Sequence, residues 1–179
     1  MAANIAKSAD AQKRIALEAD VGTCAKRGSI YLINGSDPTL TLYAASAILF
    51  HAPEKAGAER LRVLSMAPQS HRVSRRTSDT VDLEVLGLPR RNNVFELLVR
   101  DPSRHPLQVG QVVNLGELET QVDAVSGGLF TRARLHFERD IEQAEACFMV
   151  WRHGRLESVP VPRIGESVRI EFEPGPMGL

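Results

Sequence analysis

The pattern of hydrophobic and polar residues predicts a strand–helix–strand unit in the first part of the chain. The β-branched and aromatic run SIYLIN predicts a strand, the turn Asn34–Asp37 follows it, and Pro38 suits the first position of a helix. Residues 39–51 are apolar on nearly every side, which is typical of a buried helix. The alternation at 39–43 also permits a strand there, and a second strand is predicted at 61–66. This order indicates a βαβ unit.

A further helix is predicted at residues 2–21, before the βαβ unit. The segment is rich in Ala, Lys, Gln and Glu, and its larger apolar residues are only Ile5, Ile15, Leu17 and Val21. So narrow an apolar stripe is typical of a helix on the protein surface.

From residue 71 onward the pattern has a period of two, which is typical of strands with one solvated face. Apolar residues alternate with acidic ones at 81–85, and the run at 72–76 can pair with this strand across the turn at 77–79. Further short runs, separated by Gly or Pro turns, lie at 111–114, 118–125, 129–137, 147–152, 155–161 and 167–172. Such a density of short strands predicts an antiparallel barrel or sandwich.

We therefore predict an α+β protein in which an N-terminal βαβ unit packs against a C-terminal antiparallel β-barrel or sandwich. The N-terminal helix and the βαβ unit occupy residues 1–70, the β-rich unit occupies 71–174, and 175–179 form a loose tail. A chain of 179 residues is long enough for both units to belong to one continuous body.

Composition and charge narrow the classes of partner. The chain has 43% hydrophobic residues, and its 22 Lys and Arg residues balance 22 Asp and Glu residues. A net charge of zero provides no general attraction for nucleic acid or for an anionic membrane. No apolar run reaches the roughly 18 residues of a membrane span, and no signal peptide is recognisable, so we expect a chain that neither spans a membrane nor directs its own export.

The two cysteines, Cys24 and Cys147, are too far apart in sequence for a zinc knuckle or a Cys-x-x-Cys redox pair. They can form a structural disulfide, which would fit an oxidising compartment. Two separate buried thiols would instead fit the cytosol. The sequence leaves both alternatives open.

The best candidate site is the turn between the first strand and the helix. Backbone N–H groups at a helix start can bind an anion, which makes Gly35, Ser36, Asp37 and Thr39 a candidate anion-binding site. Ser36 also stands where a hydrolase nucleophile would stand, but that pattern needs Gly two residues later, where this chain has Pro38. The favoured interpretation is that Ser36 or Asp37 simply caps the helix.

Other catalytic motifs are weaker. The five histidines have no spacing typical of a local metal site, so no metal ligands are predicted. A triad of Ser36, Asp37 and a distant histidine would need the tertiary structure to assemble it. The chain has no dinucleotide, phosphate-loop or His-Glu-x-x-His motif, and no cofactor is predicted.

The basic residues gather at one place only. Arg72, Arg75, Arg76, Arg90 and Arg91 form a candidate phosphate-binding patch. Three acidic residues in the same predicted hairpin would neutralise much of its field, and no aromatic residues are interleaved to stack bases. A charged sheet edge that resists strand addition is therefore favoured, and nucleic-acid binding ranks last.

Four segments carry a family resemblance: SIYLINGSDPTLTLYAASAILFHAP, RLRVLSMAP, DTVDLEVLG and VWRHGRLESVPVPRIGESVRI. Together they resemble a soluble C-terminal domain that follows multi-spanning membrane segments in uncharacterised bacterial proteins. Relatives of that kind have Ala-Pro where this chain has Gly35 and Ser36. The resemblance implies that the N-terminal helix descends from a membrane segment and that the domain lies outside the cytoplasm.

These observations favour a non-catalytic accessory or interaction domain of a bacterial envelope or membrane-associated protein. Its expected partners are other proteins or a membrane-embedded segment of a larger protein, and a periplasmic or cell-surface location is favoured over the cytoplasm. The alternative is a small hydrolase or an anion-binding or phosphate-binding enzyme centred on Ser36 and Asp37. A histidine beside Ser36 in an open pocket would favour the enzyme, whereas a closed cap and an exposed apolar surface would favour the interaction domain.

Overall fold

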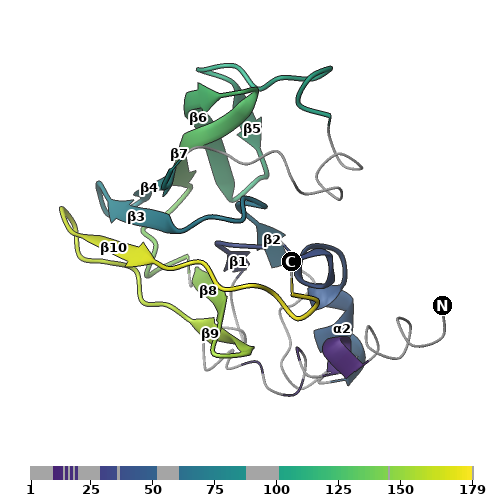
Figure 1. Ribbon diagram of the computed structural model, residues 1–179. Coiled ribbons are helices and arrows are strands. Elements are labelled where there is room, and N and C mark those ends of the chain that lie inside the picture. The colour runs from purple at the N-terminus through teal and green to yellow at the C-terminus, as the bar shows by residue number, and fades with distance from the viewer. Residues whose placement is uncertain are drawn as a thin grey trace. The chain divides into compact units, whose positions relative to one another are not determined.

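A computed structural model of the protein describes residues 10–13, 15, 17, 19, 29–35, 37–51, 61–87, 101–144 and 146–178 (Figure 1). The protein is α+β, as predicted, with two sheets and a helical segment between the first two strands. The chain forms two compact units. Unit 1 comprises Met1–Pro68, Glu145–Pro160 and Glu173–Leu179, and unit 2 comprises Gln69–Ala144 and Val161–Phe172.

Unit 1 is built on a four-stranded sheet with the order β2-β1-β8-β9. Its strands are β1 (Ile30–Leu32), β2 (Leu61–Val63), β8 (Cys147–Arg152) and β9 (Arg155–Ser158). Strand β1 runs parallel to both β2 and β8, and β8 and β9 form an antiparallel hairpin. Since all three residues of β1 are buried, the apolar run predicted as a strand lies inside the sheet.

The segment between β1 and β2 contains a helix over residues 39–51. It begins as a π-helical turn, η2 (Thr39–Tyr43), and continues as α2 (Ala44–His51). The prediction of a βαβ unit is therefore confirmed, and the alternative strand at 39–43 is wrong. Pro38 has a φ of −59°, which is the backbone angle that a helix start requires.

The core of unit 1 lies between this helix and the sheet. Leu40, Ala44, Ala47 and Ile48 face buried residues of β1 and β8. Trp151 belongs to this core, and each large apolar side chain buried there stabilises the fold by about 1.5–3 kcal/mol.

The described helical residues near the N-terminus are 10–13, 15 and 17. Ala11, Ile15 and Ala19 are buried at a spacing of four residues, whereas Leu17 is exposed. Of the predicted apolar stripe, Ile15 is therefore buried as one side of the helix requires, whereas Leu17 is not, and the buried side is completed by two alanines that the stripe did not include. Ile5 and Val21, also assigned to the stripe, lie outside the described residues.

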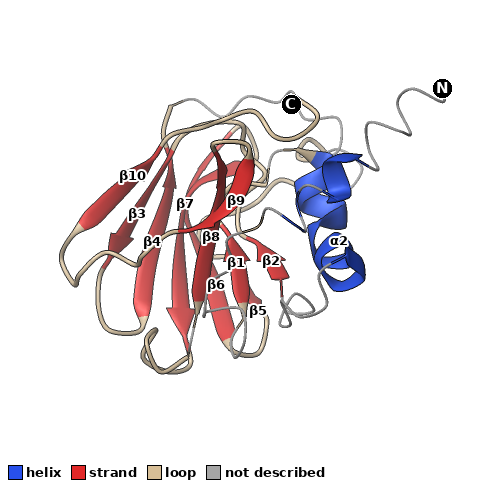
Figure 2. Cartoon of the chain, turned by 90° about the horizontal axis from the view of Figure 1, so that it is seen from below, coloured by secondary structure: helices blue, strands red, loops and turns tan. Residues whose placement is uncertain are grey.

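Unit 2 is a six-stranded antiparallel sheet with the order β10-β3-β4-β7-β6-β5. Figure 2 shows the strands of both sheets in red. Strands β10 and β5 are its two edges, so the sheet is open and not a closed barrel. Its strands are β3 (His71–Arg75), β4 (Thr80–Val85), β5 (Val112–Asn114), β6 (Leu118–Ser126), β7 (Leu129–Phe137) and β10 (Ser167–Ile170).

The alternation predicted from the sequence is present in unit 2. In β4, for example, Val81, Leu83 and Val85 are buried and alternate with partly exposed Asp82 and Glu84. The same alternation in β7 buries Ala133, Leu135 and Phe137. One face of the sheet is therefore apolar and the other is charged.

The division into units differs from the sequence-based one, which placed residues 71–174 in a single β unit. The hairpin β8–β9 belongs to unit 1, because β8 pairs in parallel with β1. Five consecutive residues of β8, Cys147 to Trp151, are buried, as is typical of a strand covered on both faces.

The C-terminal segment, predicted as a loose tail at 175–179, is held in unit 1. Trp151 Nε1–H donates to the carbonyl of Pro174 at 3.0 Å, and the backbone N–H of Met177 donates to Asp37 Oδ2 at 2.7 Å. The backbone N–H of His153 also donates to Glu173 Oε2 at 2.7 Å. A segment that the sequence marks as polar and Pro/Gly-rich is therefore ordered by hydrogen bonds to distant elements.

Candidate functional site

The turn before the helix is capped by Asp37, whose side chain is fully buried. Its Oδ1 accepts the N–H of Thr39 at 2.8 Å, and its backbone carbonyl accepts the N–H groups of Leu40 and Thr41 at 3.0 Å. The predicted role of Asp37 as a helix cap is confirmed. Ser36, the other candidate cap and the candidate nucleophile, lies outside the described residues.

The C-terminal segment covers this cap. Asp37 Oδ2 accepts the N–H of Met177, and a Cβ added to Gly175 would lie 2.1 Å from the Cβ of Asp37. Glycine is therefore required at position 175, since a side chain there would overlap the capping residue. The carboxyl group of Asp37 is enclosed by the protein's own backbone.

The backbone groups proposed to hold an anion are already engaged. The N–H of Gly35 donates to the carbonyl of Ser65 at 2.8 Å, and the hydroxyl of Thr41 donates to the carbonyl of Gly35. The N–H of Thr39 donates to Asp37. Because these donors are satisfied internally, the described part of the turn offers an anion no free N–H group from Gly35 or Thr39.

The structure separates the candidate arginine patch into individual ion pairs. Arg72 pairs with its cross-strand neighbour Glu84 at 2.8 Å, and Arg76 pairs with Asp82 at 2.7 Å. Arg75 points to the opposite, buried face of β3. Arg90 and Arg91, the remaining members of the predicted patch, lie outside the described residues.

Arg75 is a structural residue, because its guanidinium is held on several sides. It donates to both carboxylate oxygens of Glu142 and to the carbonyls of Thr77 and Ser78. The hydrogen bonds from Arg75 lower the pKa of Glu142 to about 2, and those to Glu142 raise the pKa of Arg75. Arg75 therefore connects the β3–β4 turn to the segment after β7 through hydrogen bonds.

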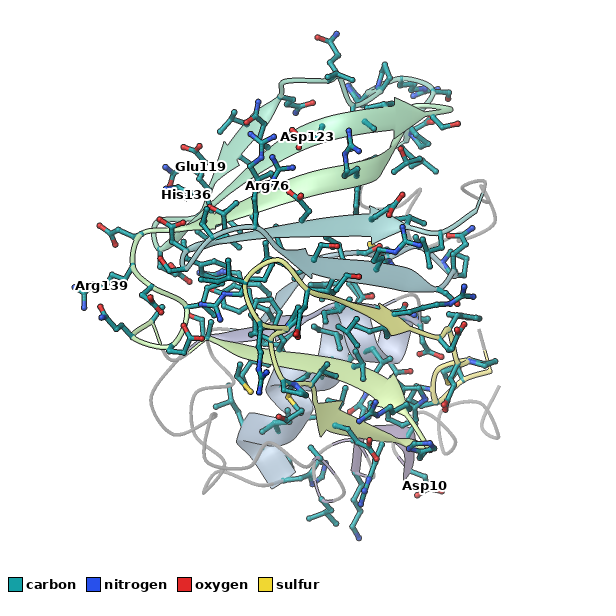
Figure 3. All side chains as sticks on the ribbon, turned by 90° about the vertical axis from the view of Figure 1, so that its left-hand side faces the viewer. Asp10, Arg76, Glu119, Asp123, His136 and Arg139 are labelled. Atoms are coloured by element: carbon teal, nitrogen blue, oxygen red, sulfur yellow. The ribbon has the colours of Figure 1, made fainter. Side chains whose placement is uncertain are left out.

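The exposed face of unit 2 carries an alternating row of charges. Asp82 lies between Arg76 and Arg134, with its Oδ1 4.0 Å from Arg134 Nε, and Arg134 donates to Asp123 at 2.9 Å. Figure 3 shows Arg76, Asp123 and His136 gathered over the strands of this sheet. Positive and negative groups neutralise each other along the row, so it forms no field of one sign.

A second charged cluster lies at the β8–β9 hairpin of unit 1. Glu157 accepts hydrogen bonds from Arg152 and from Arg155 at 2.9 Å, and it lies 3.3 Å from His153 Nδ1. The hydrogen bond from Arg152, followed by that from Arg155, lowers the pKa of Glu157 to about 2. This cluster is not predicted from the sequence, although the arginines flank a two-residue His-Gly turn whose φ angles of 52° and 76° are typical of a tight hairpin.

The histidines form no metal site among the described residues, where no group of three or more His, Cys, Asp or Glu side chains has the required proximity. His71 is buried in β3, and His153 lies at the hairpin turn. A triad with Ser36 stays a prediction, because Ser36 is not described.

Burial of His71 predicts an acid-sensitive unit 2. Desolvation lowers the pKa of this histidine from 6.5 to about 4, so between these values the unfolded chain binds a proton that the folded chain does not. Stability should therefore fall as the pH falls, by about 2–3 kcal/mol between pH 7 and pH 4.5. Denaturant unfolding at several pH values measures this slope.

The control for this prediction is His71→Gln, which replaces the imidazole with a neutral polar group. Glu142 and Glu157, with pKa values of about 2, lose their stabilising charge mainly below pH 4.5, outside the measured range. The free energy of unfolding of the variant should change less with pH than that of the parent protein, whatever its absolute value. An equal slope in both proteins would contradict the assignment to His71.

One side of the helix between β1 and β2 is exposed, which corrects the prediction of a buried helix. The exposed side consists of Leu42, Tyr43, Ser46, Leu49 and Phe50, which we call the α2 face. Phe50 is 81% exposed, and the other three apolar residues are 42–48% exposed. The buried side of the helix is also apolar, so the sequence carries no signal that could have identified the exposed side.

The α2 face is also uncharged, since the whole stretch from Pro38 to Pro53 contains no Asp, Glu, Lys or Arg. An exposed helix of an ordinary surface would carry charged residues on its solvent side. A contiguous apolar patch that is left exposed commonly marks a binding surface.

Cys147 is disulfide-bonded. The sequence has one other cysteine, Cys24, which lies outside the described residues. A disulfide at this buried position of β8 is typical of proteins that fold in an oxidising compartment.

Comparison with models of known protein families, with curated proteins and with solved structures found no match. Among the described helices, none has the length and apolar character needed to cross a bilayer.

Proposed function

We propose that the protein is a non-catalytic interaction domain of a bacterial envelope protein, and that it binds its partner through the α2 face. The observation that carries the proposal is the exposure of Leu42, Tyr43, Leu49 and Phe50 on a helix without charged residues. Exposed apolar side chains of this size cost solubility, which a binding function would explain.

Two further observations support the proposal. The carboxyl group of Asp37 and the N–H groups of Gly35 and Thr39 are used inside the protein, which argues against the alternative enzyme at that turn. The disulfide at Cys147 supports a location outside the cytoplasm.

Site-specific photo-crosslinking in the native host tests the proposal. A photoreactive residue in place of Phe50 should crosslink to a discrete protein, because this side chain is the most exposed part of the α2 face. The matched control carries the same photoreactive residue in place of Glu119, which is an exposed position on the charged face of unit 2. Equal crosslinking at both positions, or none at position 50, would contradict the proposal.

A further inference from the structure

The sequence positions of the α2 face are symmetric about Ser46, with Leu42 and Tyr43 at the end of η2 and Leu49 and Phe50 in α2. Leu42 and Phe50 each lie four residues from Ser46, and Tyr43 and Leu49 each lie three residues from it. A two-fold axis through Ser46 would therefore place an antiparallel copy of the helix so that Leu42 meets Phe50 and Tyr43 meets Leu49. A two-fold interface requires this kind of self-complementary surface.

The chemistry of the face also suits a second copy. Groups near a two-fold axis meet their own counterparts, so a charge there would face the same charge. The α2 face has none. Ser46 is small enough to let the two helix axes approach to about 8–10 Å.

Ser46 can be buried in such an interface without losing a hydrogen bond. Its hydroxyl already donates to the carbonyl of Tyr43 in the same helix, at 3.1 Å. The central polar group of the face is therefore satisfied before association, and its burial leaves no donor unpaired.

The area of the face is compatible with a weak dimer. Four apolar side chains that are 42–81% exposed leave about 400 Å² of their surface exposed in each copy. Pairing two copies would bury about 800 Å², which is the size of a weak, transient interface.

We propose that two copies of this chain associate through the α2 face, with their helices antiparallel and Ser46 at the two-fold axis. The inference rests on the proposed function, because it uses the same face, and it names the partner as a second copy of the chain. Since the helix's opposite side, with Leu40, Ala44 and Ile48, packs in the core of unit 1, association needs no rearrangement of the fold.

Sedimentation equilibrium of the purified protein tests the proposal over a range of concentrations. The mass of the parent protein should rise from 19.7 kDa toward twice that value at about 100–500 μM, as expected for a small apolar interface. Leu42→Glu and Phe50→Lys should each keep the protein monomeric, because each places charges against apolar residues of the partner.

The double variant Leu42→Glu/Phe50→Lys is the critical measurement. In the antiparallel arrangement each Glu meets the Lys of the other copy, so association should be restored at least in part. Both positions are exposed, and thermal unfolding should show that all three variants remain folded. The matched control is Ile164→Glu, at an exposed apolar position of unit 2, which should dimerise like the parent.

The outcomes separate this proposal from the proposed function. A parent protein that stays monomeric throughout, or single variants that dimerise as the parent does, would overturn the second copy as the partner. A double variant as monomeric as the single ones would overturn the antiparallel arrangement. If the parent is monomeric while a photoreactive residue in place of Phe50 still crosslinks to a different protein, the proposed interaction function is supported and the proposed dimer is refuted.

Discussion

Replacement of Asp37 by Ala should lower the free energy of unfolding by about 2–4 kcal/mol. The carboxyl group is fully buried and accepts hydrogen bonds from Thr39 and Met177, which lie at opposite ends of the chain. Loss of the cap alone costs about 1 kcal/mol, and the N–H of Met177 would lose its hydrogen-bond partner as well. Chemical denaturation monitored by the fluorescence of Trp151 measures the change, since this residue lies in the same unit.

Two further proteins show whether the cost arises from the contacts described. Asp37→Asn retains an oxygen that can accept the N–H of Thr39 but presents its amide to Met177, so it should be destabilised by an intermediate amount. In a chain truncated after Pro176, Asp37→Ala should cost less, because the bond to Met177 is already absent. An Asp37→Ala protein as stable as the parent would contradict the cap, and equal costs in both chains would contradict the bond to Met177.

Loss of the disulfide should have an effect of similar size. Cys147 is buried in β8 and disulfide-bonded, and removal of a native disulfide typically costs about 2–5 kcal/mol. Cys147→Ala should therefore unfold at a much lower denaturant concentration than the oxidised parent. The same measurement on the parent, after reduction and refolding in reductant, should give a comparable loss.

Thiol titration under denaturing conditions is the independent check. The oxidised parent should show no free thiol, and after reduction it should show the two thiols of its two cysteines. As a control, Glu119→Gln, at an exposed position of unit 2, leaves both cysteines in place and should behave like the parent. Two titratable thiols in the unreduced protein would refute the disulfide and remove its support for an oxidising compartment.

Local patterns were sufficient to predict the helix at 39–51, the parallel strands on either side of it and the alternating strands of unit 2. Each of these depends on a periodicity or a capping residue within a few positions. Asp37 could be predicted as a cap for this reason, because the N–H of Thr39 is only two residues away. Its bond to Met177, 140 residues further along the chain, has no local signal.

The candidate sites depended even more on distant partners. The sequence shows a concentration of arginines at 72–76, but only strand pairing places Glu84 and Asp82 beside Arg72 and Arg76 and brings Glu142 to Arg75. A helix that is apolar on every side likewise does not indicate which side the sheet covers. Exposure of the α2 face was therefore not predictable from composition.

The sequence by itself determined the α+β class, the positions of most strands and the helix, and the capping of that helix, because periodicity and turn chemistry act over short distances. Tertiary structure decided which strands are neighbours. It placed β8, whose residues 147–151 are all apolar, beside β1 in unit 1, and it left the sheet of unit 2 open. It also tied the C-terminal segment to Asp37 and left one side of α2 uncovered. These features depend on which buried surfaces and hydrogen-bonding groups meet when distant segments pack, and a local pattern of residues does not encode that choice.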